Sequence, residues 1–337
     1  MSNGVGSAGG MDLSALIVSW NTRDLLRDCL RSTLEAAAGM TVEVIVVDNA
    51  SADGSAAMVR REFGPDPRVC LIANAANEGF ARGNNQAYAA SSGEILLVLN
   101  PDVVLDAPAL KGMIEHLQDH PEAGIVSCNL VGMDGEPQTL HRAFPTLPIV
   151  FSTWTWIGGR IDRFVLLGLN RRRYRLEGRR RDGMAIIDQA AAACLVLRRS
   201  TVELIGGLFD ERFPLFFNDV DLSRRVWDAG LEVHVRYDLS VRHHGRASIR
   251  QLPDGARRLQ LYEAVARYFE IHEPPWKARL VRLMVAPNRW RAARAASRTD
   301  SRTRTSASSP TIPAPGTSST RPTSPGTNGP PARSARR

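Results

Sequence analysis

The first hundred residues alternate between short apolar segments and amphipathic segments, and this alternation restricts the fold more than any other feature. We expect strands at 12–20, 42–47, 69–73 and 94–99, and helices at 21–38, 55–63 and 78–90. The strand segments are almost continuously apolar, which is typical of strands buried on both faces. Such strands joined by helices predict an α/β protein with a mostly parallel central sheet and helices on both faces.

The rest of the chain is less regular. It predicts a strand at 186–198 leading into a helix near Ser200, a helix at 219–229, a strand at 231–235 and a helix at 257–270. Residues 1–10 are rich in glycine and serine, and residues 286–337 combine arginine with serine, threonine, proline and glycine. Segments with so few large apolar side chains cannot bury a core. We therefore expect one domain over 11–285, between a flexible N-terminus and a disordered basic tail.

The charge of the chain is concentrated at one end. The net charge is +8, but the ten arginines and one aspartate between Arg289 and Arg337 carry +9, which leaves −1 for residues 1–288. The basic character belongs to the tail, so no nucleic acid partner is expected. A dinucleotide-dependent oxidoreductase is excluded because no glycine-rich turn follows the first strand.

Cysteine usage and hydropathy bear on the compartment. Cys29, Cys70, Cys128 and Cys194 are scattered, without the spacing of a zinc site or a disulfide framework. Reduced thiols in a cytoplasmic protein are the simplest interpretation. No uncharged apolar run approaches the roughly 20 residues that a membrane-spanning helix needs.

Polar clusters follow three of the predicted strands. Ser19-Trp20-Asn21 ends the first, Asp48-Asn49-Ala50-Ser51 the second, and Asn100-Pro101-Asp102 follows the strand at 94–99. Ligands of open parallel sheets bind beyond the carboxyl ends of the strands. The recurrence of polar residues at three such ends predicts one shared ligand crevice.

Two of the candidate residues suit a metal. A carboxylate at Asp102 is well placed to hold Mg²⁺ or Mn²⁺, which can bridge a diphosphate. The Asn-Pro-Asp sequence suits a turn equally well. His243 and His244 follow a later strand, and one of them can complete a metal site, although a lone histidine is more often structural.

A second acidic cluster follows aromatic residues, in the sequence Phe216-Phe217-Asn218-Asp219-Val220-Asp221. An apolar wall beside a carboxylate raises its pKa toward that of a general base. Carboxylates at this position also cap the N-terminus of a helix. Both roles are filled if one acid caps the helix and the other reaches the site.

Seven short motifs in order carry a resemblance to a known family. They are Leu16–Asn21, Val46–Ser51, Asn77–Asn85, Leu99–Val103, Gly206–Asp210, Phe216–Leu222 and His243–Ser248. With them the chain resembles family-2 glycosyltransferases of the GT-A fold, particularly the rhamnosyltransferase-like branch, from about Asp12 to Ser248.

The resemblance implies roles for individual residues. Asp219 is implied as the catalytic base. The metal ligands are implied to be Asp102 and His243, with Asn100 opening this branch's form of the Asp-X-Asp motif. The nucleotide sugar is implied to contact the pocket residues Ser19, Asn21, Asp48 and Asn100 and the loop residues Asn77, Gly79, Arg82 and Asn85.

The resemblance also implies an activity. A nucleotide-diphosphate sugar is the implied donor, rhamnose the favoured sugar, and a cell-envelope polysaccharide or lipid-linked glycan the acceptor. A single displacement with a general base inverts the anomeric centre. Asn218 stands where the family often has Glu, and Asn100 and Ala190–Ala193 also depart from its pattern. A catalytically silent GT-A domain that binds nucleotide sugar or a partner protein remains the alternative.

One basic segment suggests a membrane surface. Arg171–Arg173, Arg175 and Arg179–Arg181 follow the apolar residues Phe151, Trp154, Trp156 and Ile157. Basic and aromatic residues together suit an anionic lipid surface, which predicts a peripheral protein on the inner face of the plasma membrane. A solvated loop beside core aromatics explains the same pattern.

Overall fold

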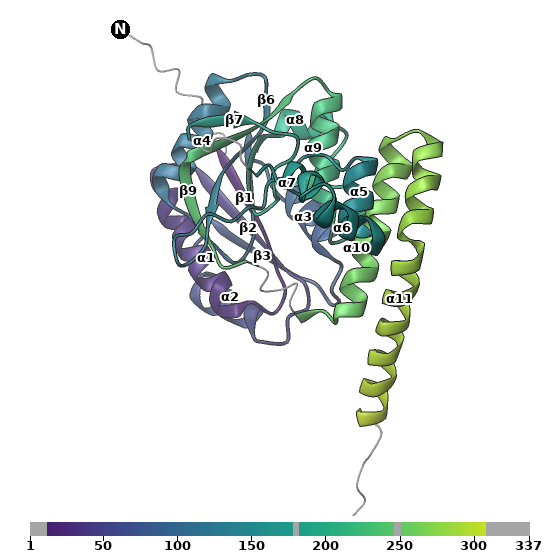
Figure 1. Ribbon diagram of the computed structural model, residues 1–337. Helices are drawn as coiled ribbons and strands as arrows, with labels where there is room; N and C mark the ends of the chain where they lie inside the picture. The colour runs from purple at the N-terminus through teal and green to yellow at the C-terminus, as the bar shows by residue number, and fades with distance from the viewer. Residues whose placement is uncertain (1–11, 178–181, 246–250, 308–337) are drawn as a thin grey trace, which may run out of the picture. The chain divides into compact units, whose positions relative to one another are not determined.

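A mixed sheet of nine strands forms the centre of the computed structural model, which describes residues 12–177, 182–245 and 251–307 (Figure 1). The strand order is β3-β2-β1-β4-β8-β6-β9-β5, with β7 beside β9. Parallel pairing joins β1 to β2 and β4, β2 to β3, and β6 to β9, whereas β8 is antiparallel to β4 and β6. The strands are β1 Leu13–Ser19, β2 Val42–Asp48, β3 Val69–Ala73, β4 Ile95–Leu99, β5 Val103–Val104, β6 Ala123–Val131, β7 Met184–Ile186, β8 Cys194–Arg198 and β9 Glu232–His243.

Helices cover both faces of this sheet, as predicted. One face carries α1 Arg23–Ala36, α2 Ser55–Glu62 and α4 Ala107–Asp119, and the other carries α3 Phe80–Ala89, α8 Arg199–Leu204 and α9 Asn218–Asp228. The division follows from the alternation of side chains along β1. Ala15 and Ile17 join the first core, and Leu16 and Val18 join the second. The continuous apolar run of β1 is therefore buried on both sides.

Five further helices lie beside the α9 side of the sheet. They are α5 Leu147–Trp154, α6 Trp156–Phe164, α7 Leu169–Tyr174, α10 Asp254–His272 and α11 Pro275–Ala307. A third apolar core joins α5, α10 and α11 to Val220 of α9. Figure 1 shows α10 and α11 as a helical hairpin. Between 12 and 177, 182 and 245, and 251 and 307, no helix combines the length and apolarity needed to cross a bilayer.

Two predicted boundaries differ from the structure. The single strand predicted at 186–198 is two strands, because β7 pairs with β9 whereas β8 pairs with β4 and β6. The tail predicted to be disordered from residue 286 is helical as far as Ala307, where α11 ends. Alanine and arginine, which predominate in 289–298, favour helix, and the proline-rich composition begins only later. Among the described residues, those up to Thr299 form one compact unit, and the end of α11 from Asp300 belongs to a second.

Candidate active site

The polar clusters that follow β1, β2 and β4 lie at one edge of the sheet. Ser19 and Asp48 are register partners in the parallel β1–β2 pair, and the Asn49 N–H donates to the Ser19 carbonyl oxygen at 2.8 Å. Ile17 of β1 pairs with Leu99 of β4. The topology thus brings residues separated by about eighty positions to the same end of three adjacent strands.

Asp48 offers this edge a buried acceptor. Its side chain is buried, and one carboxylate oxygen, Oδ2, accepts a hydrogen bond from the Ser51 N–H at 3.0 Å. The other oxygen, Oδ1, is buried and has no hydrogen-bond partner within the described part of the chain. Buried carboxylate oxygens are almost always hydrogen-bonded. A ligand with an N–H or O–H group would supply the missing donor.

Ser19 and Asn21 hold the loops around Asp48. The Ser19 hydroxyl shares a hydrogen bond with the Thr22 hydroxyl at 2.9 Å. Asn21 adopts a positive φ of 51° and accepts the Ala52 N–H through its side-chain oxygen at 2.7 Å. Asn21 therefore joins the loop after β1 to the loop after β2, and its side-chain oxygen is already engaged.

The segment before α3 packs closely against a distant loop. The Asn77 side-chain oxygen accepts the Gly79 N–H at 3.0 Å. Gly79 has a φ of +88°, and a Cβ there would lie 3.1 Å from the Pro214 carbonyl oxygen. The backbone of Pro214 in turn accepts a hydrogen bond from the Phe80 N–H at 2.8 Å. Glycine suits this position because it alone combines that φ with so close an approach.

Asn85 and Arg82 project from α3 itself. The Asn85 amide donates to the Phe209 carbonyl oxygen at 2.9 Å and accepts the Phe209 N–H at 3.1 Å, so it joins α3 to the loop before α9. Arg82 pairs with Glu78 at 3.0 Å and is more than half exposed. An exposed guanidinium next to the predicted donor pocket can exchange a carboxylate for a phosphate.

A chain of amides that sequence reasoning missed supports the same pocket. Asn49 accepts a hydrogen bond from the Asn74 amide at 2.8 Å, and Asn74 also donates to Gln86 at 2.8 Å. Asn49 further donates to the Gly79 carbonyl oxygen at 3.0 Å. Asn49 lies within the motif Val46–Ser51, but Asn74 and Gln86 carry no local sequence signal, because only the fold brings them together.

Asp102 and His243 meet although 140 positions separate them in the chain. β5 pairs with the end of β9, so that Val103 lies opposite His243, and the Asp102 carbonyl oxygen accepts the His244 N–H at 2.9 Å. The His243 Nε2 atom lies 3.3 Å from the Asp102 Oδ1 atom. Both side chains are buried.

Gln138 fixes the orientation of the His243 ring. Its side-chain nitrogen donates to the His243 carbonyl oxygen at 2.7 Å, so its oxygen faces the ring Nδ1 atom, also at 2.7 Å. Nδ1 must then carry a hydrogen, and the lone pair of the neutral ring lies on Nε2. Nε2 has no hydrogen-bond partner within the described residues and points at a carboxylate oxygen.

This pair fits a divalent cation. Two ligands at 2.0–2.1 Å from a metal and at right angles to each other are about 3 Å apart. The observed separation of 3.3 Å is close to that value. In the described residues no group of three or more His, Cys, Asp and Glu side chains has a metal-binding arrangement. Asp102 and His243 would supply two ligands, which suits a metal that takes the others from substrate phosphates and water.

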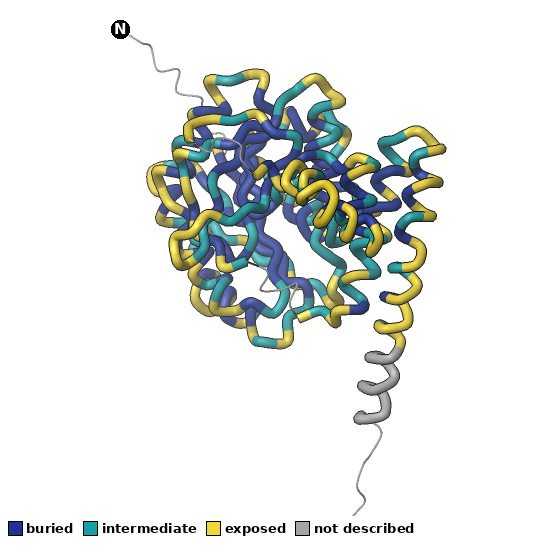
Figure 2. The backbone as a smooth tube through the Cα atoms, viewed as in Figure 1, coloured by how far each residue is buried: buried dark blue, intermediate teal, exposed yellow. Residues whose placement is uncertain are grey.

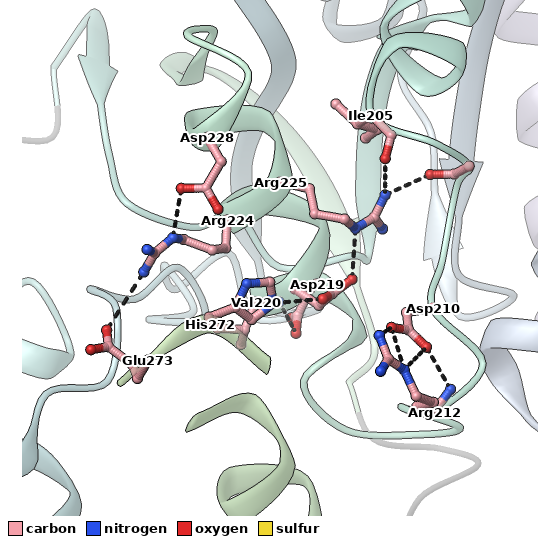
Figure 3. A network of polar contacts seen from close by, with 12 residues as sticks. Ile205, Asp210, Arg212, Asp219, Val220, Arg224, Arg225, Asp228, His272 and Glu273 are labelled. Carbon is pink, nitrogen blue, oxygen red and sulfur yellow. Dashed lines mark hydrogen bonds and ion pairs between the residues drawn. The ribbon is translucent and has the colours of Figure 1, made fainter. Parts of the chain in front are cut away.

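The two acids of α9 have different surroundings. Asp221 is buried and accepts hydrogen bonds from Arg225 and His272, each at 2.8 Å. Figure 3 shows Arg225 and His272 at the start of α9. Arg225 also donates to the backbone oxygens of Gly207 and Leu208. Asp221 therefore joins α9 to α10 and to the preceding loop. Of the two acids in this cluster, Asp221 is the one with a structural role.

Asp219 is held through the backbone. Its carboxylate accepts the Val220 N–H at 2.9 Å, and a further backbone hydrogen bond comes from Ala192. Burial raises the pKa of Asp219 above its ordinary value, and hydrogen bonds from the backbone together with the charge of Arg142 oppose that rise. The aromatic residues that precede Asp219 in the sequence led us to expect a raised carboxyl pKa.

The start of α9 is held by that aromatic wall. Phe217 has a φ of 68°, an unusual conformation for a residue with a bulky side chain. Its ring packs against Trp154 and Tyr268, with centroids 5.9 and 5.8 Å away. Asn218, where the family often has Glu, donates to the Leu215 carbonyl oxygen at 3.0 Å, so this amide shapes the turn before Asp219.

The sheet and the helices that cover it have the GT-A fold. The mannosyltransferase PcManGT of Pyrobaculum calidifontis, solved with GDP-Man and Mn²⁺, has this fold. It superposes with a TM-score of 0.50 at 19% identity, covering 86% of this chain and 75% of its own. The predicted fold class is confirmed.

The chain belongs to glycosyl transferase family 2, since the model of that family matches residues 14–203. An N-acetylglucosaminyl-diphospho-decaprenol L-rhamnosyltransferase of Mycobacterium tuberculosis is 28% identical over 63% of this chain and 70% of its own length. The O-antigen biosynthesis protein RfbC of Myxococcus xanthus is 30% identical over 70% of this chain. These relatives confirm the resemblance to the rhamnosyltransferase-like branch. The chain spans only 18% to 35% of the length of three curated relatives.

Proposed function

We propose that this protein is a metal-dependent, inverting glycosyltransferase whose donor is a nucleotide-diphosphate sugar. The proposed acceptor is a cell-envelope polysaccharide or a lipid-linked glycan, and rhamnose is the favoured sugar. The names of the mycobacterial and myxobacterial relatives support the sugar and the acceptor class. The four free cysteines support a cytoplasmic location. We also propose that residues 11–285 contain the catalytic domain.

The observation that carries this proposal is the pairing of Asp102 with His243. A ring nitrogen lone pair directed at a carboxylate oxygen 3.3 Å away is repulsive unless a proton or a cation lies near both. A divalent cation, Mg²⁺ or Mn²⁺, would supply Lewis acid stabilisation of the leaving diphosphate. Asp102 and His243 would hold it, and Gln138 would keep the ring in the ligating tautomer.

The donor would lie along the edge formed by β1, β2 and β4. The unpartnered Oδ1 of Asp48 would accept from the base or ribose, in a pocket bounded by Ser19 and Asn21. Arg82 would leave Glu78 and contact the diphosphate. Gly79, Asn77, Asn85 and Asn100 would shape the backbone around these groups.

Asp219 would act as the general base. It would take the proton of the acceptor hydroxyl while that oxygen attacks the anomeric carbon and the diphosphate leaves from the opposite face. A single displacement of this kind inverts the anomeric centre. The raised pKa of Asp219 suits proton transfer near neutral pH better than an ordinary carboxyl would.

The test is the configuration of the product. Purified protein would be given the nucleotide sugar that stabilises it in a thermal-shift panel, with Mn²⁺ and a lipid-linked glycan acceptor. Proton NMR of the product would give the anomeric configuration, which we expect to be opposite to that of the donor. Retention of configuration would contradict the mechanism.

Asp219→Asn separates catalysis from binding. We expect the variant to fold and bind donor while transfer falls at least a hundredfold. Asp228→Asn, on the exposed side of the same helix, is the matched control and should keep full activity. Donor binding by the native chain without transfer to any acceptor would favour the catalytically silent alternative, and Asn100 and Asn218 would then be the first positions to change.

A further inference from the structure

The segment from Trp156 to Glu177 exposes an unusual amount of apolar surface. It contains α6 and α7, and we call it the α6–α7 arm. Figure 2 shows it as a largely exposed stretch in front of the molecule. Its exposed large apolar side chains, each between 40% and 74% accessible, are Trp156, Ile157, Ile161, Phe164, Val165, Leu166, Leu167 and Leu169. Water-exposed apolar groups this dense mark an interaction surface.

The charges on the arm are almost all positive. Its arginines are Arg160, Arg163, Arg171, Arg172, Arg173 and Arg175, and all of them are exposed. The only acid between 156 and 176 is Asp162, which is fully buried and accepts the Asn170 N–H at 3.0 Å. Glu177, at the end of the arm, lies 3.6 Å from Arg175. The arm therefore presents cationic and apolar groups to solvent, without an exposed acid before Glu177.

Contacts with the third core fix the arm in place. Thr155 caps α6 by accepting the Gly158 N–H at 3.0 Å, and the Asn170 amide donates to the Ser152 hydroxyl at 2.9 Å. Tyr174 packs edge-on against Trp154 with ring centroids 5.4 Å apart. Because the base is held, the exposure of the apolar residues is built into the structure. The sequence grouped Phe151 and Trp154 with the suggested lipid-binding residues. In the structure both belong to α5, on which the arm packs, and Trp154 is buried there.

The arm also adjoins the proposed catalytic base. The Tyr174 carbonyl oxygen accepts the Ala143 N–H at 2.9 Å, and the Arg142 guanidinium lies 5.9 Å from the Tyr174 ring. Arg142 is the residue whose charge acts on Asp219. A surface bound by the arm would thus lie next to the place where the acceptor hydroxyl is needed.

We propose that the α6–α7 arm docks on an anionic phospholipid bilayer, with its apolar side chains at the acyl boundary and its arginines at the headgroups. Arginines beside aromatic rings, such as Arg160 at 4.8 Å from the Trp156 ring centroid, suit that interface. A second copy of the chain is a poorer occupant because it would bring two arginine clusters together. The inference rests on the proposed function, because a lipid-linked acceptor would be held at the membrane surface to which the arm binds.

The test is vesicle co-sedimentation of the full chain. We expect binding to phosphatidylcholine vesicles that contain phosphatidylglycerol, weak binding to phosphatidylcholine alone, and loss of binding at high salt.

The double variant Phe164→Ser, Leu167→Ser should lower partitioning into these vesicles about tenfold or more. Arg171→Gln, Arg172→Gln, Arg173→Gln together should lower it about a hundredfold. Leu204→Ser, which removes an equally exposed leucine from α8, is the matched control and should bind like the native chain.

Several results would overturn the proposal. They are the absence of binding to anionic vesicles, equal binding to neutral ones, and arm variants that bind like the native chain. If Leu283→Ser in α11 lost vesicle binding while the arm variants kept it, the membrane contact would belong to α11 and not to the arm. Donor binding, measured without vesicles, should be unchanged in the arm variants. Vesicle binding without any donor binding would therefore contradict the proposed function and leave the docking surface standing.

Discussion

At the residue scale, a few side chains have surroundings that give them unusual chemistry. Asp219 and Asp221 are two positions apart, yet Asp221 is held by the side chains of Arg225 and His272, whereas Asp219 accepts hydrogen bonds from the backbone of Val220 and Ala192. Sequence reasoning identified the pair but could not divide the roles. The division depends on α10, which supplies His272 from fifty residues further along the chain.

Arg142 provides a test of the base. Its charge lowers the pKa of Asp219, opposing the dominant effect of burial. Arg142→Gln should therefore raise the Asp219 pKa further and move the acidic limb of the kcat/KM profile to higher pH. Arg142→Lys, which keeps the charge, should move it less. The measurement is the pH profile of the transfer rate, and an unchanged acidic limb in both variants would argue against Asp219 as the base.

At the element scale, the loop before α3 and the start of α9 depend on close packing. Gly79→Ala places a Cβ 3.1 Å from the Pro214 carbonyl oxygen in a backbone conformation that favours glycine. We expect a loss of about 1–3 kcal/mol in the free energy of unfolding and weaker donor binding. Gly135→Ala is the control, since Gly135 also has a positive φ but has open space around it. Chemical denaturation of both variants checks this, and equal losses would show that the Pro214 contact is unimportant.

Asp221→Asn should act on stability rather than on chemistry. It removes the buried carboxylate between Arg225 and His272, and breaking a buried ion pair typically costs about 3–5 kcal/mol. Because the Arg225 side chain is about one-fifth exposed, we expect the lower end of that range. Urea denaturation of Asp221→Asn and Asp219→Asn should separate the two acids. A similar stability loss in both would contradict their assigned roles.

The elements that sequence predicted best are those buried on both sides. β1, β2 and β4 were visible because each is a continuous apolar run, and their polar ends identified the site. β5, with two residues, and α5 to α7, with irregular apolar spacing, carried no such signal. Asp102 was a metal candidate from its place after β4, but the choice of His243 over His244 came from the resemblance, because their contact with Asp102 depends on β5. Gln138 was missed altogether.

At the scale of the whole molecule, a histidine cluster behind the sheet should make stability depend on pH. Glu232 accepts from His234 at 2.8 Å, so His234 presents its Nδ1 lone pair to His116 Nε2 at 2.9 Å. Burial, aided by the charges of His120 and His234, lowers the pKa of His116 to about 4. In the unfolded chain a histidine titrates near 6.5.

The sign of this effect follows from proton binding. Between pH 6.5 and 4 the unfolded chain binds a proton at residue 116 that the folded chain does not, so stability falls as the pH is lowered through that window. His116→Gln should flatten the stability profile there, and His120→Gln, which removes only one of the charges that lower the His116 pKa, should flatten it less. Thermal melts across the window check this, and a profile that His116→Gln leaves unchanged would contradict it.

The most direct test of the central claim is the metal dependence of donor binding, measured by isothermal titration calorimetry. The native chain should bind one nucleotide-diphosphate sugar in the presence of Mn²⁺ or Mg²⁺ and at least tenfold more weakly after chelation. His243→Ala should lose this metal dependence, whereas His244→Ala, at the exposed neighbouring histidine, should keep it. Donor affinity that is equal with and without metal, or metal dependence that survives in His243→Ala, would contradict the site described here.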